Sequence, residues 1–209
     1  ESHFPGATAV FLTGMGGDSN PSPRGTLLDA KRHGLELAGA VGGVLSRPMR
    51  TVRGPLKFAF AEVELPFREP PTKDQLLQDA QSKDLYIKRR AERFLERLEK
   101  GEPLPNSIRL PMAAIRLGSE LTFLSMGGEV VVDYALRFKR MFAEDHPWTI
   151  GYAYEIPCYI PSIRILKEGG YEAESSLIYY GFYGPFQSRI EHLITEQMRE
   201  LVGRVRSID

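Results

Sequence analysis

The side chain with the greatest potential for chemistry in this sequence is an isolated glutamate. Glu129 follows a pair of glycines and precedes the segment VVVDY, which begins a predicted helix. A carboxylate at this point lies near a helix N-terminus, whose dipole favours negative charge. Glu129 can therefore face a cleft as a metal ligand, although its position fits a simple helix-start acid equally well.

Tyrosines are concentrated in the carboxy-terminal part of the chain. Tyr152, Tyr154, Tyr159 and Tyr171 fall within twenty residues of one another. Phenols can bind a metal or donate a hydrogen bond to an oxyanion. The commoner role of such a group is amphipathic packing at a sheet edge, so the tyrosines alone leave both interpretations open.

A loop dense in glycine, proline, asparagine and serine, GMGGDSNPSPRG, follows the apolar run ATAVFLT. Consecutive glycines let the backbone approach a ligand closely, and their N–H groups can bind an anion or orient a substrate. A turn without any such role has the same composition.

The histidines and the cysteine do not complete a metal site by themselves. Histidines occur singly, at His3, His33, His146 and His192, and none has the spacing that places two imidazoles on one helix face. Cys158 is the only cysteine, which excludes an internal disulfide and a thiolate zinc cluster. We therefore expect the histidines to be surface or helix residues.

Composition excludes several function classes. Lys+Arg and Asp+Glu number 27 each, and no basic run is present, so we expect no nucleic-acid partner and no attraction to anionic membranes. No apolar run approaches the roughly 20 residues that a transmembrane helix requires. The apolar fraction of 42% with 26% charged residues is typical of a soluble globular chain.

Elements in the first half are predicted from apolar periodicity. Residues 7–13 resemble an interior strand, and 26–45 a helix. Residues 56–67 alternate, but their apolar register slips near Ala61, which predicts a β-bulge. A single helix is expected over 72–100, where Thr72 and Gln75 fit a capping box.

Elements in the second half must position Glu129 and the tyrosines. Residues 108–117 and 121–125 fit a hairpin around a Gly118-Ser119 turn, and a helix is expected over 131–142. A strand over 148–154, a segment rich in proline and glycine up to Gly184, and a closing helix over 190–205 complete the chain. The interleaving predicts an α/β (α+β) fold, with a mixed β-sheet core flanked by helices.

The motifs in their order resemble a known family. The loop GGDSNPSPRG is similar to the GDVSPN-type active-site loop of neutral/alkaline non-lysosomal ceramidases, and more closely to the GGDxNPxPR form of bacterial ceramidase-like proteins. GGE before a helix follows, and then GYAYEIPCYIPS, EGGYEAESS and YYG. From Ala7 to about Gly184 the chain resembles the carboxy-terminal half of a ceramidase-type catalytic domain, so residues 1–209 are expected to be a portion of a single domain.

This resemblance implies specific roles. Glu129 and Tyr159 correspond to zinc ligands, and Tyr171, twelve positions after Tyr159, corresponds to a tyrosine that faces the substrate. The family's two histidine ligands lie upstream of the loop, so the resemblance places them in an amino-terminal half that this chain lacks. Asn20 stands where the family has a serine before proline, and the substrate-binding residues of the loop correspond to Gly17, Asp18 and Ser19.

A zinc-dependent hydrolase is the function that the resemblance implies. Its substrate would be a lipid-like N-acyl amide, ceramide or a related compound, and its location would be outside the cytoplasm. We expect no counterpart here of the immunoglobulin-like domain that the true ceramidases carry. Because an asparagine cannot act as a nucleophile, zinc-activated water would attack the amide, while Tyr171 and Asn20 polarise its carbonyl.

Two other hypotheses stay open at this point. Asn20 in the serine position also fits a non-catalytic relative that binds a lipid-like or sugar-like ligand. A structural fragment without its own function would expose a sheet edge and aggregate.

Overall fold

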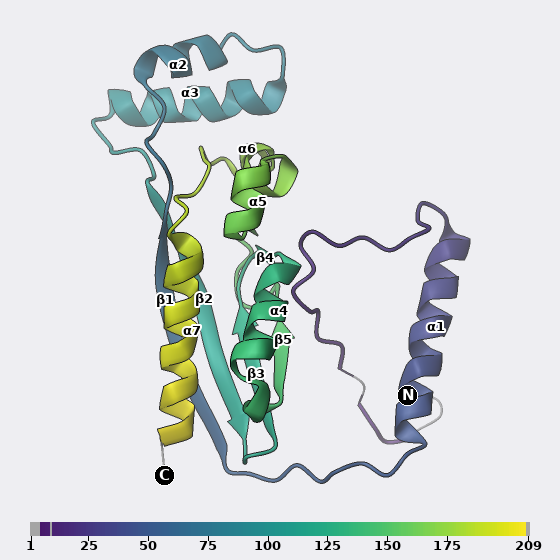
Figure 1. Ribbon diagram of the computed structural model, residues 1–209. Helices are drawn as coiled ribbons and strands as arrows, with labels where there is room; N and C mark the ends of the chain where they lie inside the picture. The colour runs from purple at the N-terminus through teal and green to yellow at the C-terminus, as the bar shows by residue number, and fades with distance from the viewer. Residues whose placement is uncertain (1–4, 9, 208–209) are drawn as a thin grey trace.

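A mixed four-stranded sheet forms the centre of the protein. The structure is a computed structural model, which describes residues 5–8 and 10–207 (Figure 1). The strand order is β1-β2-β3-β5, with β1 (Leu56–Pro66), β2 (Ser107–Leu117) and β3 (Leu121–Met126) antiparallel, and β5 (Pro147–Ile150) parallel to β3. The predicted α/β class with a mixed sheet and flanking helices is confirmed.

A second, much smaller sheet and several helices complete the fold. The strands β4 (Glu129–Val130) and β6 (Tyr159–Ile160) pair in parallel. The helices are α1 (Leu27–Leu45), α2 (Lys73–Asp79), α3 (Leu85–Glu99), α4 (Val132–Met141), α5 (Ile163–Glu168), α6 (Leu177–Tyr180) and α7 (Ile190–Ser207). Short 3₁₀ and π turns occupy Ala143–Asp145 and Tyr171–Ser175.

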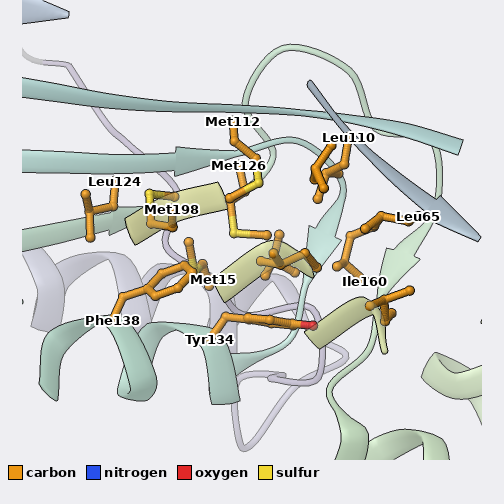
Figure 2. Packing of buried hydrophobic residues seen from close by; sticks show 14 of the residues in the cluster. Met15, Leu65, Leu110, Met112, Leu124, Met126, Tyr134, Phe138, Ile160 and Met198 are labelled. Atoms are coloured by element: carbon orange, nitrogen blue, oxygen red, sulfur yellow. The ribbon is translucent and has the colours of Figure 1, made fainter. Parts of the chain in front are cut away.

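The hydrophobic core lies between one face of the large sheet and the helices α4 and α7. Figure 2 shows sheet residues such as Met112 and Leu124 facing Tyr134 and Phe138 of α4, with Met198 of α7 between them. All of these side chains are fully buried. Burial of one such side chain stabilises the fold by about 1.5–3 kcal/mol, so the core holds the sheet and both helices together.

The opposite face of the same sheet is apolar and open. Leu56, Phe58 and Phe60 on β1 are 65%, 52% and 40% exposed, and Trp148 on β5 is 59% exposed. The predicted β-bulge is wrong, because β1 pairs with β2 residue for residue from Leu56↔Leu117 to Pro66↔Ser107. The slip in the apolar pattern instead marks a strand whose first half is apolar on both faces.

The predicted helix over 72–100 forms as two helices. The capping box of Thr72 and Gln75 starts α2 as predicted. The chain then turns, because the Asp84 carboxylate accepts hydrogen bonds from the N–H groups of Tyr86 and Ile87 and so starts α3. A strong cap inside an amphipathic pattern ends one helix and begins the next.

Two predicted strands differ from the structure. Of residues 7, 8 and 10–13, none belongs to a strand, and Thr13 provides a carbonyl to Gly151 N at 3.1 Å without a continuing ladder. The strand expected over 148–154 ends at Ile150, because Tyr152 and Tyr154 adopt φ of 55° and 62°, which a strand cannot accommodate.

Helix α1 matches its predicted range, with Thr26 and Asp29 forming a capping box. It stands apart from the other layers in Figure 1, and none of its residues is buried. The predicted hairpin of β2 and β3 and the predicted helices over 131–142 and 190–205 also form. Within the described part of the chain, no helix combines the length and apolarity that crossing a membrane requires.

Candidate functional site

The pairing of β4 with β6 brings Glu129 and Tyr159 together. They are direct partners in the parallel ladder, where Glu129 N donates to Cys158 O at 3.0 Å and Val131 N donates to Ile160 O at 3.3 Å. The two residues expected from the resemblance to be zinc ligands therefore lie side by side, although thirty positions separate them in the sequence.

The glycines before Glu129 are required by close backbone packing. A Cβ on Gly127 would lie 2.7 Å from Glu155 O, and one on Gly128 would lie 2.6 Å from Ile160 Cγ1. Gly128 also has φ +78°, a conformation that residues with a Cβ rarely adopt. The GGE motif is thus explained by the way in which the chain delivers Glu129 between β3 and β6.

The glycine-rich loop docks directly on this strand. Gly17 N donates to Val130 O at 2.8 Å, and a Cβ on Gly17 would lie 2.5 Å from Glu129 O. The Asp18 carboxylate accepts a hydrogen bond from Val132 N at 2.7 Å, at the start of α4. Gly17 is therefore held against Glu129, and Asp18 anchors the loop to the start of α4.

Ser19 and Asn20 continue the same loop on the surface. Both are exposed, and Ser19 N donates to Gly16 O at 3.0 Å, which closes a tight turn. The loop thus presents these polar groups to solvent after the segment that Gly17 and Asp18 fix in place.

Several phenols surround the Glu129 carboxylate. Tyr180 donates a hydrogen bond to Oε1, and the Tyr152 hydroxyl lies 3.5 Å from Oε2. Tyr159 contacts Tyr180 and Tyr171, with ring centroids 6.3 Å and 5.5 Å apart. The structure therefore joins Tyr171 to the pair of expected zinc ligands.

Tyr180 has no role in the site predicted from sequence. Its only signal there is the YYG motif that follows EGGYEAESS. It reaches Glu129 because α6 packs after the π turn Tyr171–Ser175, a local geometry that apolar periodicity does not reveal. Tyr154, by contrast, lies away from the carboxylate, where its hydroxyl is 2.9 Å from Ser125 Oγ and its ring contacts Phe60 at 5.5 Å.

The carboxylate and the burial of the phenols shift their protonation equilibria. Burial, followed by the hydrogen bond and negative charge of Glu129, raises the pKa of Tyr159 and of Tyr180 well above the ordinary phenol value. Burial and Glu129 also raise the pKa of Tyr152. The phenols are therefore neutral hydrogen-bond donors toward the Glu129 carboxylate.

The donor set fits part of a zinc coordination sphere. Among residues 5–8 and 10–207, Glu129 forms no ion pair with a Lys, Arg or His side chain. The same residues contain no group of three or more His, Cys, Asp or Glu able to hold a metal. Because catalytic zinc takes three protein ligands, a zinc ion bound by Glu129 and Tyr159 would need further ligands from elsewhere.

The described histidines do not supply those ligands. His33 contacts Pro23 O at 2.7 Å and Glu36 on its own helix, and His192 contacts Glu196 on α7. His146 is an exposed residue with φ 48° after a 3₁₀ turn. His3 lies outside the described residues. The expectation that these histidines are surface or helix residues is confirmed for the three that the structure describes.

Two surface pockets differ in their relation to this site. The larger, about 1070 Å³, lies between β1 and the α2–α3 pair and is lined by prolines, mixed charges and Leu104. A smaller one, about 250 Å³, is lined partly by Tyr180, whose hydroxyl contacts Glu129. The smaller pocket therefore shares Tyr180 with the carboxylate cluster, whereas the lining of the larger one includes no residue of that cluster.

Comparison of the chain with protein-family models, with curated proteins and with solved structures found no match.

Proposed function

We propose that the protein is a zinc-dependent hydrolase of the neutral ceramidase type, which cleaves the N-acyl amide bond of a lipid-like substrate. The observation that carries this proposal is the pairing of Glu129 with Tyr159, with Tyr171 in ring contact with Tyr159. Three residues that the resemblance assigns to one active site are distant in sequence and adjacent in space.

Each residue then has a defined part. Glu129 and Tyr159 would hold the zinc ion together with the histidines that the resemblance places upstream. Zinc would supply an activated water at neutral pH. The Tyr171 hydroxyl and the Asn20 amide would donate hydrogen bonds to the substrate carbonyl oxygen as negative charge develops there.

The loop residues would position the substrate. Gly17 is fixed to Val130 by a backbone hydrogen bond, and Asp18 caps α4, so the segment carrying Ser19 and Asn20 has a rigid base. Arg164 lies 3.7 Å from the Asp18 carboxylate, which further restricts the loop. Preorganised donors cost little reorganisation during the reaction, which is why a fixed loop suits this role.

A binding protein without catalytic activity is the second candidate. It is favoured by Asn20, which replaces the family's serine and cannot form a covalent intermediate. Such a protein would bind a lipid-like or sugar-like ligand in the same place and would not turn it over.

Hydrolysis of a panel of N-acyl amides by the zinc-loaded, full-length protein tests the choice. Tyr171→Phe should lower kcat about 10²–10³-fold, the usual effect of losing an oxyanion donor, while zinc content stays unchanged. Tyr154→Phe is the matched control, because its hydroxyl contacts Ser125 instead. An Asn20→Ala variant with full activity would exclude Asn20 from the mechanism, and full activity of Tyr171→Phe would refute the proposed arrangement.

A further inference from the structure

A row of tyrosine rings leads away from the carboxylate cluster. Tyr159 contacts Tyr171 at a centroid distance of 5.5 Å, Tyr171 contacts Tyr179 at 6.4 Å, and Tyr179 contacts Tyr86 of α3 at 4.9 Å. Tyr171, Tyr179 and Tyr86 are 47%, 57% and 55% exposed. Large aromatic faces left open in a continuous row form a surface suited to an elongated ligand.

This row ends at the small pocket between α3 and α6. Its volume is about 250 Å³, and its lining includes Tyr86, Tyr179 and Tyr180 together with Arg89, Arg90 and Arg93. Tyr180, which lines this pocket, also donates a hydrogen bond from its hydroxyl to the Glu129 carboxylate. The pocket is therefore connected to the proposed active site both along the row and through Tyr180.

The arginines of the pocket differ in how far they are engaged. Arg90 is committed, because it donates to Phe182 O at 2.9 Å, lies 3.7 Å above the Tyr183 ring and lies 3.8 Å from Asp79. Arg93 donates through one nitrogen to Gly181 O at 3.0 Å, against a glycine with φ +73° whose absent Cβ leaves room for the guanidinium. Arg93 is thus held at the pocket wall with most of its donors available.

The positive charges of Arg89 and Arg93 are not neutralised by an acidic side chain of the described residues. Within the described chain, neither Arg89 nor Arg93 forms an ion pair with an acid, and the neighbouring Glu92 pairs with Lys88 at 3.9 Å. Guanidinium groups bind phosphate, sulfate and carboxylate through paired N–H donors. The lining therefore has the chemistry of an anion-binding subsite with an aromatic approach.

We infer that the pocket formed by Tyr86, Arg89, Arg93 and Tyr179 binds an anionic group at one end of the substrate. The substrate is then an elongated acidic amide, with its amide at Glu129 and Tyr171, its chain along the tyrosine row and its acid in the pocket. This inference rests on the proposed function, which it extends from an N-acyl amide in general to an anionic one.

Binding of octyl phosphate and of octanol to the full-length protein tests the inference, because the two probes differ only in the anion and neither contains an amide to hydrolyse. By calorimetric titration, octyl phosphate should bind at least tenfold more tightly than octanol, as expected for charge-assisted hydrogen bonds. It should also bind more tightly than inorganic phosphate, which cannot use the tyrosine row. Equal affinity for octyl phosphate and inorganic phosphate would overturn the elongated substrate.

Substitutions locate the anion. Arg89→Gln with Arg93→Gln should reduce the preference for octyl phosphate over octanol to less than twofold. Arg89 makes no ion pair within the described residues, and Arg89→Gln alone should reduce the preference for octyl phosphate several-fold. The matched control is Arg32→Gln with Arg109→Gln, which removes the same charge from α1 and β2 and should leave the preference intact.

The outcomes separate this inference from the function on which it rests. A preference that survives in the arginine variants but disappears in Glu129→Gln would place the anion at the metal site and overturn the inference. Zinc binding and amide hydrolysis without any preference for octyl phosphate would refute the anion pocket and leave the hydrolase. A preference that depends on the arginines in a protein without zinc would support the pocket and refute the hydrolase.

Discussion

Gly128 supplies the sharpest test of how the site is built, because a single methyl group at this position should disturb it. Gly128 has φ +78°, and its missing Cβ would lie 2.6 Å from Ile160 Cγ1 and 3.0 Å from Cys158 O. Gly101 has nearly the same φ, +73°, but its missing Cβ would meet no atom within 4 Å. The two glycines therefore differ in packing and share the backbone conformation.

The expected losses of stability follow from the backbone conformation and from the packing at each glycine. An alanine with positive φ costs roughly 1–2 kcal/mol, partly offset by about 0.4–1 kcal/mol from the reduced freedom of the unfolded chain. Overpacking at Gly128 adds about 1–3 kcal/mol, since the contacts are with a buried side chain and with backbone. Gly101→Ala should thus destabilise by about 1 kcal/mol, and Gly128→Ala by about 2–4 kcal/mol.

Urea denaturation of both variants and of the parent protein measures this difference. The Gly128→Ala midpoint should fall clearly below that of Gly101→Ala, and Gly128→Ala should also bind zinc more weakly, because Ile160 lies next to Tyr159 on β6. Equal destabilisation by the two substitutions would show that β4 and β6 do not approach as closely as the reasoning requires.

Further predictions concern the buried ion pairs and the open sheet face. Burial alone would raise the pKa of Asp145, but hydrogen bonds from Arg206 and Arg116 outweigh it and lower this pKa below its usual value. The stabilisation is therefore present above the unfolded pKa of about 3.9 and is lost as pH falls through the folded pKa. Asp145→Asn should lower the free energy of unfolding by about 2 kcal/mol at pH 7, which is less than the loss of a fully buried ion pair costs, because Arg206 is half exposed. In urea melts at decreasing pH, the difference in stability between the variant and the parent should shrink. A difference that stays constant with pH would contradict the stabilising role of the Asp145 charge. We expect the 209-residue chain to self-associate through the open face, because Phe58 and Phe60 are exposed there. In light scattering, Phe58→Thr with Phe60→Thr should suppress this association with little change in the melting temperature, and association that is absent from the parent chain or unchanged in the variant would contradict this expectation.

Elements with their own caps and turns were predictable from sequence. The capping residues Thr26 and Thr72, the Gly118 turn and the apolar stripes of α4 and α7 are local signals, and each produced the expected element. The division of 72–100 was missed because the apolar period continues past Asp84, whose capping role competes with helix propagation.

Whether the predicted strands form depends on tertiary contacts more than it does for the helices. Phe58 and Phe60 suggested a bulge because an apolar residue was assumed to face the core, whereas the structure leaves these rings on an open face. Residues Tyr152 and Tyr154 alternate like a strand, but hydrogen bonds from Tyr152 N to Gly128 O and from Ala153 N to Met126 O hold this segment in another conformation.

The proximity of several candidate residues was expected from the sequence. Glu129, Tyr159, Tyr171, Gly17 and Asp18 were named from motifs, and the structure brings them together. The sequence did not indicate which tyrosine would contact the Glu129 carboxylate. Tyr180 reaches it only through the π turn that precedes α6.

Zinc content tests the central claim most directly. We predict about one zinc per full-length molecule by elemental analysis, lost in Glu129→Ala and weakened in Tyr159→Phe. Glu62→Ala, which removes a carboxylate exposed on β1, is the matched control and should retain the metal. Absence of zinc from the parent protein, or unchanged zinc in Glu129→Ala, would contradict the proposed metal site and favour the ligand-binding alternative.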